Sequence, residues 1–557
     1  MTARGLRIWI NDQPCHVPAG TTVAAACALH GHGHGLRRSV QGQARSALCG
    51  MGVCGECRVH IDGQAHQLSC QRLCQEGMQV HTQAAAQVPP PAPSHRTHPP
   101  MAQQGLPWPP QLVVVGAGPA GLAAAEAAAQ QGVSVLLLDA AERSGGQVWR
   151  AQQGQLPPEA AARLARLQAL GVTLWTRTRV VGVLPGRRLR LDHGDAASVL
   201  SAPSLVLATG ARELLLPFPG WTRPGVHGAG GLQALVKGGW PVRAQAVLVA
   251  GAGPLLLASA ASLVQAGARV LEIAHETEAA DLRRFAGQLL RHHPDVLRQA
   301  AALARQLWRV PQRTGWRVLQ ALGDGDDGPL RAVTLLHRSG RTRTVPCQAL
   351  AAGWGLVPQT DLAQALGCAL SHGPGPQPIR VNDQQASSVP GVWAAGECTG
   401  VAGMACALLT GTLAGLAAAS ALQGTPLAIT HEQQHALARQ RRYADLVARS
   451  FALGPATPAR WDDQTLICRC EDVPWGRLKN QADLHSAKLA SRCGMGHCQG
   501  RLCWSALDGL VPAAPARPAR PLLGAMPLSH CLALHDDPVS SADSADSGGA
   551  PADPRPQ

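Results

Sequence analysis

The sequence predicts an α/β protein of several domains. With 557 residues, 46% of them hydrophobic, the chain is too long for a single core. The stretch 111–140 reads as strand, glycine turn, helix and second strand, and a similar stretch follows at 246–274. Cysteines gather before the first of these stretches and again near the end of the chain. We therefore expect two dinucleotide-type folds at the centre, with metal-binding regions on either side.

The first glycine turn has the G-x-G-x-x-G spacing, with Gly116, Gly118 and Gly121 after the apolar strand 112–115. The first glycine permits a tight turn, the second lets a pyrophosphate approach the backbone, and the third brings helix and strand together. Phosphates would lie at the helix N-terminus. Asp139 ends the second strand, where its carboxylate can accept hydrogen bonds from ribose hydroxyls. The segment predicts a dinucleotide site that also includes Pro119 and Ala120.

Composition excludes several classes of function. The formal charge of +14 comes almost entirely from scattered arginines, and aromatic residues make up only 3% of the chain. Nucleic-acid binding therefore lacks both a basic stripe and a stacking surface. The N-terminus has no apolar signal-peptide region, and the uncharged run 401–424 is diluted by glycines and hydroxyls. We expect a buried helix there, no membrane span, and a cytoplasmic protein, with peripheral attachment at the inner face of the membrane as an alternative.

The N-terminal cysteines have the spacing C-x4-C-x2-C-x12-C, given by Cys49, Cys54, Cys57 and Cys70. This is the first part of the plant-type ferredoxin pattern, in which four thiolates bind a 2Fe-2S cluster. The intervening glycines allow a loop tight enough for backbone N–H groups to point at sulfur. Zinc is the alternative metal. Cys15, Cys27 and Cys74 fit no ligand spacing and are expected to be packing residues.

This N-terminal segment, with its CGMGVC loop, resembles the small ferredoxin-like domain of the heterotetrameric sarcosine oxidase and hydrogen cyanide synthase group. The resemblance implies a β-grasp domain over 1–82, and we expect a helix at 22–29. From 83 to 110 the composition turns to Pro, Gln, Ala and His, which predicts a semi-extended linker. Such a tether would hold two redox centres at a high effective concentration.

Further signals follow the first fold: Gly146 and Gln147, then Thr209 and Gly210, and much later Gly396 and Glu397 in the string AAGEC. An N-terminal fingerprint paired with a distant A-A-G-E resembles the flavoproteins with two dinucleotide-binding domains. The resemblance implies FAD at the first site, with Glu397 binding the ribityl chain and the helix 401–420 facing the isoalloxazine. The FAD domain is then expected in two parts, 111–242 and 345–425.

The second glycine turn, in an NAD-like domain over 243–344, departs from the fingerprint. Gly251 and Gly253 match the first two glycines, but Leu256 and Ala274 stand where the third glycine and the acid are expected. Glu276 follows two residues later. NAD(P) binding is therefore doubtful, and the domain is expected to keep this fold for architecture. Two amphipathic helices are predicted over 277–310, and a hairpin turn at 323–328.

The last cysteines give C-x-C-x22-C-x4-C, with Cys468, Cys470, Cys493 and Cys498. Four thiolates in two pairs can enclose zinc or a second 2Fe-2S cluster, and Cys503 is a rival fourth ligand. The region 426–511 resembles the small helical bacterioferritin-associated-ferredoxin type of domain. That domain closes the large subunits of opine oxidase, hydrogen cyanide synthase and hydroxyproline dehydrogenase. The composition of 512–557 predicts a disordered tail.

The chain as a whole resembles the small, ferredoxin-like subunit of that group joined end to end with the large, FAD-binding one. The resemblance implies an FAD-dependent oxidoreductase with two 2Fe-2S clusters, acting as the electron-transfer subunit of an amine or amino-acid dehydrogenase complex. Its partner would be a D-amino-acid-oxidase-like flavoprotein, its acceptor the respiratory chain, and its substrate class D-hydroxyproline, opines, sarcosine or proline, or glycine. No catalytic base is identified, and no C-x2-C or C-x4-C pair lies between Cys74 and Cys468. The alternatives are a self-contained NAD(P)H-dependent reductase and an iron–sulfur docking module.

Overall fold

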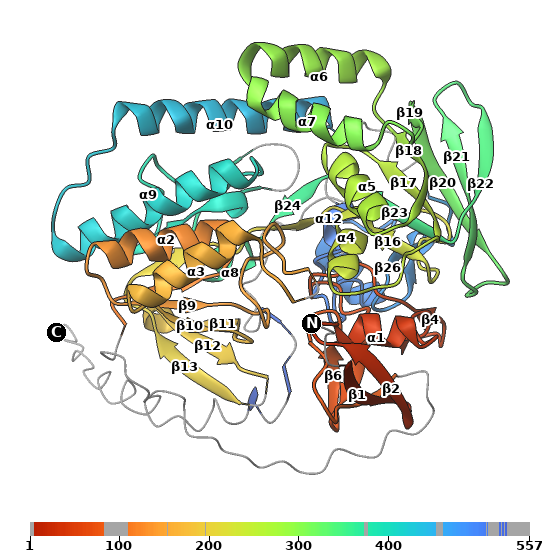
Figure 1. Cartoon of the computed structure of the whole chain (residues 1–557), viewed down its shortest axis with the longest axis horizontal. Helices are drawn as coiled ribbons and strands as arrows, with labels where there is room; N and C mark the ends of the chain where they lie inside the picture. Colours follow the sequence, from red (N-terminus) through yellow and green to blue (C-terminus); the bar gives the residue numbers. More distant parts are fainter. Residues whose placement is uncertain are drawn as a thin grey trace, which may run out of the picture.

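The computed structural model describes residues 5–82, 110–152, 154–194, 196–372, 377–452 and 461–507, together with residues 510, 523–524, 526–527 and 530–531. The predicted linker lies outside these ranges except for Pro110, and so does most of the predicted tail. Within the described part, three α/β units and a C-terminal segment pack around one another (Figure 1).

The N-terminal unit is a five-stranded mixed sheet with one helix, in the strand order β2-β1-β7-β5-β6. Strands β1 and β2 form an antiparallel hairpin, and β1 pairs in parallel with β7, which is the β-grasp arrangement predicted for 1–82. Alternating residues such as Ile8 and Ile10 are fully buried against the helix, as a half-buried sheet requires. Thr22 caps this helix by accepting the N–H of Ala25. The elements are β1 (Gly5–Ile10), β2 (Gln13–Pro18), α1 (Val23–Leu29), β3 (Arg37–Arg38), β4 (Ala44–Arg45), β5 (Arg58–Ile61), β6 (Gln64–Leu68) and β7 (Gln79–His81).

The second unit contains a parallel sheet in the order β10-β9-β8-β14-β25. Strands β8 and β9 are buried along their whole length, since layers cover both faces, and this explains their uninterrupted apolar sequence. The predicted strand 112–115 is confirmed. The elements are β8 (Leu112–Val115), α2 (Pro119–Gln130), β9 (Val135–Leu138), α3 (Pro158–Ala169), β10 (Thr173–Trp175), β11 (Arg179–Leu184), η1 (Pro185–Arg187), β12 (Arg188–Asp192), β13 (Ala197–Ser201), β14 (Leu205–Leu207), β25 (Val392–Ala394), η2 (Gly396–Thr399) and α9 (Met404–Gln423).

Helices α2 and α9 lie side by side over this sheet (Figure 1). Two glycines of α9 permit the close approach: a Cβ added at Gly411 or Gly415 would lie 2.2 Å from the carbonyl oxygen of Ala120 or Ala124. Helix α9 is long and apolar enough to cross a membrane by length and composition, yet half of its most apolar window is buried inside the protein. Its sequence is therefore explained by packing, as the composition of 401–424 predicted.

The third unit is a parallel sheet in the order β16-β23-β17-β18-β19 with an antiparallel sheet β20-β21-β22. The two amphipathic helices expected over 277–310 are confirmed as α6 and α7, and the hairpin turn at 323–328 joins β20 to β21. The elements are β16 (Val226–Gly228), α4 (Ala229–Lys237), β17 (Ala246–Gly251), α5 (Leu255–Gln265), β18 (Arg269–His275), α6 (Ala279–His292), α7 (Pro294–Gln306), β19 (Gln312–Thr314), β20 (Trp316–Gly323), β21 (Leu330–His337), β22 (Thr342–Pro346) and β23 (Ala349–Gly353). The two-stranded sheet β15 (Ala211–Glu213) and β24 (Leu356–Pro358), followed by α8 (Asp361–Ala365), joins this unit to the second.

The C-terminal segment begins with helix α10 and then folds as short elements beside the N-terminal unit (Figure 1). It is anchored on the third unit by indole hydrogen bonds: Trp461 Nε1 donates to the oxygen of Pro217 at 2.8 Å, and Trp221 Nε1 donates to that of Leu466 at 2.6 Å. Leu523, one of the described residues of the tail, donates its N–H to the carbonyl oxygen of Val181 at 2.7 Å. The elements are α10 (His431–Ser450), β26 (Leu466–Cys468), β27 (Val473–Pro474), η4 (Trp475–Arg477), α11 (Leu484–Ser491) and α12 (Cys503–Leu507).

Candidate functional site

A cavity of about 710 Å³ opens between the N-terminal, second and third units. Ten of the predicted dinucleotide residues line it: Gly116, Gly118, Pro119, Ala120, Asp139, Gly146, Gln147, Thr209, Gly210 and Glu397. Segments about 280 residues apart in sequence therefore meet at one site, because the parallel sheet brings the carboxyl ends of its strands to the same edge.

The remaining two predicted residues, Gly121 and Gly396, act through packing. A Cβ added at Gly121 would lie 1.7 Å from the carbonyl oxygen of Gly116, so only glycine lets α2 approach β8 this closely. At Gly396, where φ is +77°, an added Cβ would lie 2.7 Å from that of Ala120. Both glycines hold the turn around the cavity in place.

The glycine turn fits a pyrophosphate. Gly116 has φ of +106°, and a Cβ there would lie 2.3 Å from the oxygen of Ala208. Gly118 is the N-cap residue of α2. Gly146 has φ of +61°, and a Cβ added there would lie 3.0 Å from the Cα of Gly118. Bare backbone from two segments thus faces the space in front of the helix N-terminus, where phosphate oxygens can accept N–H groups.

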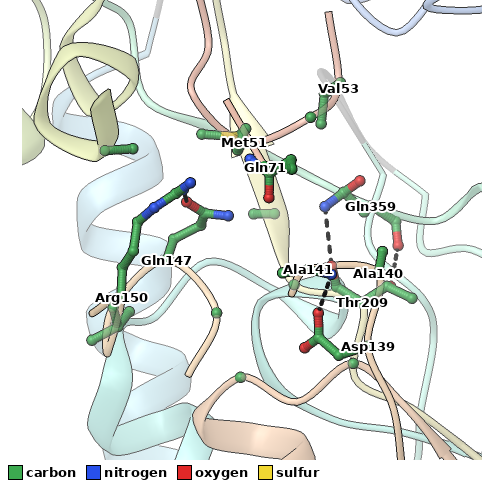
Figure 2. Close-up of a pocket in the computed structure, with 18 of the residues that line it drawn as sticks. Met51, Val53, Gln71, Asp139, Ala140, Ala141, Gln147, Arg150, Thr209 and Gln359 are labelled. Carbon is green, nitrogen blue, oxygen red and sulfur yellow. Dashed lines mark hydrogen bonds between the residues drawn. The ribbon is translucent and has the colours of Figure 1, made fainter. Parts of the chain in front are cut away.

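Asp139 is held by backbone at the cavity edge. Its carboxylate accepts the N–H of Ala117 and the N–H of Ala141, each at 2.7 Å, and the second bond is drawn in Figure 2. Burial raises the pKa of Asp139 to about 6 despite these bonds. An ionised carboxylate has acceptor positions beyond the two already used, so a pair of ribose hydroxyls fits this position. Glu397 also lines the cavity, and burial raises its pKa.

One wall of the cavity comes from the N-terminal unit. Met51, Val53 and Gln71 point toward it from the cysteine loop (Figure 2), and Cys70 lines it as well. Arg150 connects this wall to the second unit: its guanidinium donates to Gln147 Oε1 at 2.9 Å and to the carbonyl oxygen of Cys70 at 3.2 Å. Sequence analysis did not identify Arg150, because one of its two partners, Cys70, lies in another domain.

The N-terminal cysteine group, Cys49, Cys54, Cys57 and Cys70, is brought together in the interior with 1–2% exposure. The N–H of Cys54 lies 3.4 Å from Cys49 Sγ, and the amide of Gln71 lies 3.4 Å from Cys70 Sγ. A hydrogen bond from the Cys57 thiol is the main cause that lowers the pKa of Cys70 to about 6. Four buried thiols with N–H donors aimed at sulfur suit an anionic iron–sulfur cluster. Cys15, Cys27 and Cys74 are buried in the domain core, as predicted.

The cysteine loop docks on helix α4 of the third unit. Gly228 donates its N–H to the carbonyl oxygen of Leu48 at 3.0 Å, and His227 Nδ1 lies 2.7 Å from the carbonyl oxygen of Ala47. A Cβ added at Gly231 would lie 2.2 Å from the oxygen of Leu48. This close backbone contact fixes the loop against the cavity.

The C-terminal cysteine group consists of Cys468, Cys470, Cys493, Cys498 and Cys503, all buried. The Sγ atoms of Cys468, Cys493 and Cys503 lie within 4.8 Å of one another. Hydrogen bonds from Cys493 and Cys503 lower the pKa of Cys468 to about 3, and Cys470 pairs with Cys498. The structure therefore groups two members of the predicted set, Cys468 and Cys493, with the rival Cys503, while the other two predicted members form a pair.

Glu213 is a further carboxylate at the cavity. It is buried, and sequence analysis did not predict it. It accepts the N–H groups of Gly230 and Gly231, at 2.9 and 3.1 Å, at the N-terminus of α4. Burial raises its pKa to about 7. Lys237, at the other end of α4, also lines the cavity, and burial lowers its pKa. No sequence pattern marks Glu213, since its strand pairs with β24, about 140 residues away.

The second glycine turn has a different environment. Leu256 is fully buried in the core under α5, where the fingerprint has a glycine. Glu276, the only nearby substitute for the ribose-binding acid, accepts a hydrogen bond from Trp354 Nε1 at 2.9 Å. Leu255 and Ala258 of α5 line the main cavity.

Comparison with known protein families gives two matches. Residues 110–426 match the pyridine nucleotide-disulphide oxidoreductase family, and residues 3–85 match the 2Fe-2S iron-sulfur cluster binding domain. Together they cover the cysteine wall and all of the residues that line the cavity except Arg501, Leu523 and Gly524.

Curated relatives include hydrogen cyanide synthase subunit HcnB of Pseudomonas aeruginosa, 34% identical over 70% of this chain and 90% of its own length. One of the opine oxidase subunits of Agrobacterium tumefaciens is 30% identical over 72% of this chain and 85% of its own. Hydrogen cyanide synthase subunit HcnA of Pseudomonas aeruginosa is 40% identical over 79 residues, which are 14% of this chain and 75% of HcnA.

Among solved structures, the L-proline dehydrogenase of P. horikoshii aligns with a TM-score of 0.64. The alignment covers 95% of this chain and 98% of that one at 17% sequence identity. The two proteins therefore share a fold.

Proposed function

This chain belongs to the pyridine nucleotide-disulphide oxidoreductase family and is related to HcnB and to subunits of opine oxidase, and from that premise we propose that it is the electron-transfer subunit of an amine or amino-acid dehydrogenase complex. It is an FAD-dependent oxidoreductase with an iron–sulfur domain. The proposed substrate class is D-hydroxyproline, opines, sarcosine or proline, or glycine. A D-amino-acid-oxidase-like flavoprotein is the proposed partner, and the complex would work in the cytoplasm and deliver electrons to the respiratory chain.

The observation that carries this proposal is the shared wall of the cavity. Met51 and Val53 of the cysteine loop line the same space as Gly118 and Asp139, and so does Cys70. Electrons leaving a flavin in this cavity would need to cross only that wall to reach iron bound by the N-terminal cysteine group.

The chain's own residues would bind and orient the cofactor. Bound FAD would supply the acceptance of two electrons and their release one at a time. The glycine turn and the α2 N-terminus would hold the pyrophosphate, and Asp139 the ribose. Arg150, which lines the cavity and donates to Cys70, would place a positive charge where negative charge accumulates on reduction.

A separate subunit for substrate oxidation follows from the proposal. HcnA and HcnB are named as subunits of hydrogen cyanide synthase, and this chain is similar to both, over 79 and 433 residues. We infer that the chain joins the two roles in one polypeptide, with the two cysteine groups binding two 2Fe-2S clusters. The buried Leu256 and the engaged Glu276 argue against NADH as the electron source.

The proposal is tested by co-expressing the full chain with a D-amino-acid-oxidase-like flavoprotein from the same organism and purifying the complex without air. Proline, sarcosine, glycine and an opine are added in turn, with NADH in a parallel cuvette. We expect one amino acid to bleach the flavin and then the iron–sulfur absorbance, and NADH to be inactive. Rapid bleaching of the isolated chain by NADH would replace the proposal with the self-contained reductase.

A matched pair of variants separates electron transfer from folding. Cys54→Ser removes one member of the N-terminal cysteine group, and Cys347→Ser changes a buried cysteine outside both groups. We expect both variants to retain flavin. Only Cys54→Ser should lose substrate-driven reduction of an external one-electron acceptor. Equal loss in both variants would indicate a general folding defect and contradict the proposed path.

A further inference from the structure

The two cysteine groups are joined by a buried ion network. Glu56 lies between Cys54 and Cys57, and Arg469 lies between Cys468 and Cys470. Although 413 positions separate them in sequence, Arg469 Nε donates to Glu56 Oε2 at 2.9 Å. The two side chains are 1% and 0% exposed.

The network extends on both sides of this pair. Arg37 forms a second ion pair with Glu56, and its guanidinium also donates to the carbonyl oxygen of Arg469 at 3.2 Å. Arg45 pairs with Asp472 at 2.7 Å. All five side chains are at least 97% buried, and they come from both cysteine-bearing segments.

Hydrogen bonds connect the ion network to a sulfur atom of the N-terminal cysteine group. The backbone N–H of Glu56 donates to Cys54 Sγ at 3.4 Å, while its carboxylate holds Arg469, whose peptide neighbours are both members of the C-terminal group. A second contact supports the docking: a Cβ added at Gly55 would lie 2.3 Å from Cδ2 of His497, the residue before Cys498. The two loops therefore touch through backbone, imidazole and ion pair.

The charge of the network is favourable for thiolate clusters. Three arginines and two carboxylates leave one net positive charge in a buried volume, where charges are screened far less than in water. Buried ion pairs contribute little net stability compared with apolar packing, so their retention here calls for another reason. A charge between two iron–sulfur clusters changes the cost of adding an electron to each of them.

We propose that Glu56 and Arg469 are positioning residues that join two iron–sulfur clusters, one on each cysteine group, into a single electrostatically coupled pair. In the step they serve, one electron leaves reduced iron at the N-terminal group and reduces iron at the C-terminal group. No bond forms or breaks, and no proton moves, since the ion network stays paired throughout. This inference rests on the proposed presence of two clusters and deepens the proposed function.

The first test uses the unmodified full chain, purified without air and reduced with dithionite. Iron analysis should give four iron atoms per chain, and the electron paramagnetic resonance signals of the two reduced clusters should be broadened by their interaction. Cys470→Ser should remove one cluster and sharpen the signal of the other. Two signals that add without interaction, or only two iron atoms per chain, would overturn the inference.

The second test measures both reduction potentials in charge variants. Glu56→Gln removes a negative charge beside both clusters and should favour reduction of each by roughly tenfold, which is about 59 mV for one electron. Arg469→Gln should shift both potentials in the opposite direction. The control is Glu126→Gln, which removes the charge of a buried glutamate on α2 that pairs with two arginines of α3.

A shift at one cluster only, or an equal shift in the Glu126→Gln control, would refute the shared role of Glu56. If neither charge variant folds, the interaction in the unmodified protein decides the question. Loss of substrate-driven reduction in the complex with normal coupling in the isolated chain would instead count against the proposed function. The experiments therefore distinguish a failure of the proposed cluster coupling from a failure of the proposed function.

Discussion

The two glycines at the start of helix α2 should respond to alanine in different ways. A Cβ at Gly121 would lie 1.7 Å from the oxygen of Gly116, whereas one at Gly118 would lie 3.8 Å from the Cα of Gly146. Carbon–oxygen contacts in proteins are rarely closer than about 3.3 Å, so Gly121→Ala must separate α2 from β8 by about 1.5 Å. Gly118 has φ of −79°, which alanine adopts without strain.

The magnitudes follow from these contacts. Overpacking against immovable backbone should make Gly121→Ala cost at least about 3 kcal/mol of stability. For a unit of about 200 residues this lowers the melting temperature by roughly 6–12 °C. Gly118→Ala should change the stability of the apoprotein by less than about 1 kcal/mol. Its methyl group would instead occupy the space predicted for the pyrophosphate and weaken flavin binding.

The assay is thermal unfolding of the flavin-stripped protein, followed by fluorescence titration with FAD. We expect Gly121→Ala to lower the melting temperature and lose flavin, and Gly118→Ala to lose flavin affinity alone. An unchanged melting temperature in Gly121→Ala, or a larger fall in Gly118→Ala, would refute the steric reasoning. Normal FAD affinity in Gly118→Ala would contradict the placement of the pyrophosphate.

Three further outcomes are expected. Burial raises the pKa of Glu213 from 4.5 to about 7, so its contribution to stability falls as pH rises between these values. Denaturation of the parent and of Glu213→Gln at pH 5.5 and 8 should therefore show the variant gaining on the parent by about 2 kcal/mol between the two pH values. Gly55→Ala should loosen the contact between the cysteine groups by colliding with His497, and thermal unfolding should show a larger loss than Gly63→Ala, whose glycine has a similar φ and open space around it. Cys503→Ser should lower the iron content from four atoms per chain if this thiol is a ligand, whereas unchanged iron and spectra would assign the site to the other four thiols.

Local sequence patterns were sufficient for the units themselves. The strand at 112–115, the helices α6 and α7 and the hairpin after β20 are produced by hydrophobic periodicity and turn residues, which act within a few positions of one another. The thiol spacing of Cys49, Cys54 and Cys57 likewise reflects a loop whose shape is set by its own glycines. Such features need no contact with distant residues and can therefore be predicted from the sequence alone.

The site was predicted in its components but not in its assembly. Sequence analysis identified Gly118, Asp139 and Glu397 from fingerprints, yet it gave no sign of Glu213 or Arg150. Each of those two side chains is held by backbone from another segment: Glu213 by the N-terminus of α4, and Arg150 by Cys70 of the N-terminal unit. Neither residue has a sequence pattern around it that predicts these contacts.

The fold class, the glycine turn of the dinucleotide site and the two sets of thiols could be predicted from the sequence, because each depends on residue types at fixed local spacing. The structure was needed to show that the cysteine loop forms a wall of the cavity and that Glu56 meets Arg469 in the interior. Buried charges and close backbone contacts of this kind depend on how separate units dock. Docking is set by the shape and polarity of whole surfaces, and adjacent residues in a sequence carry little information about it.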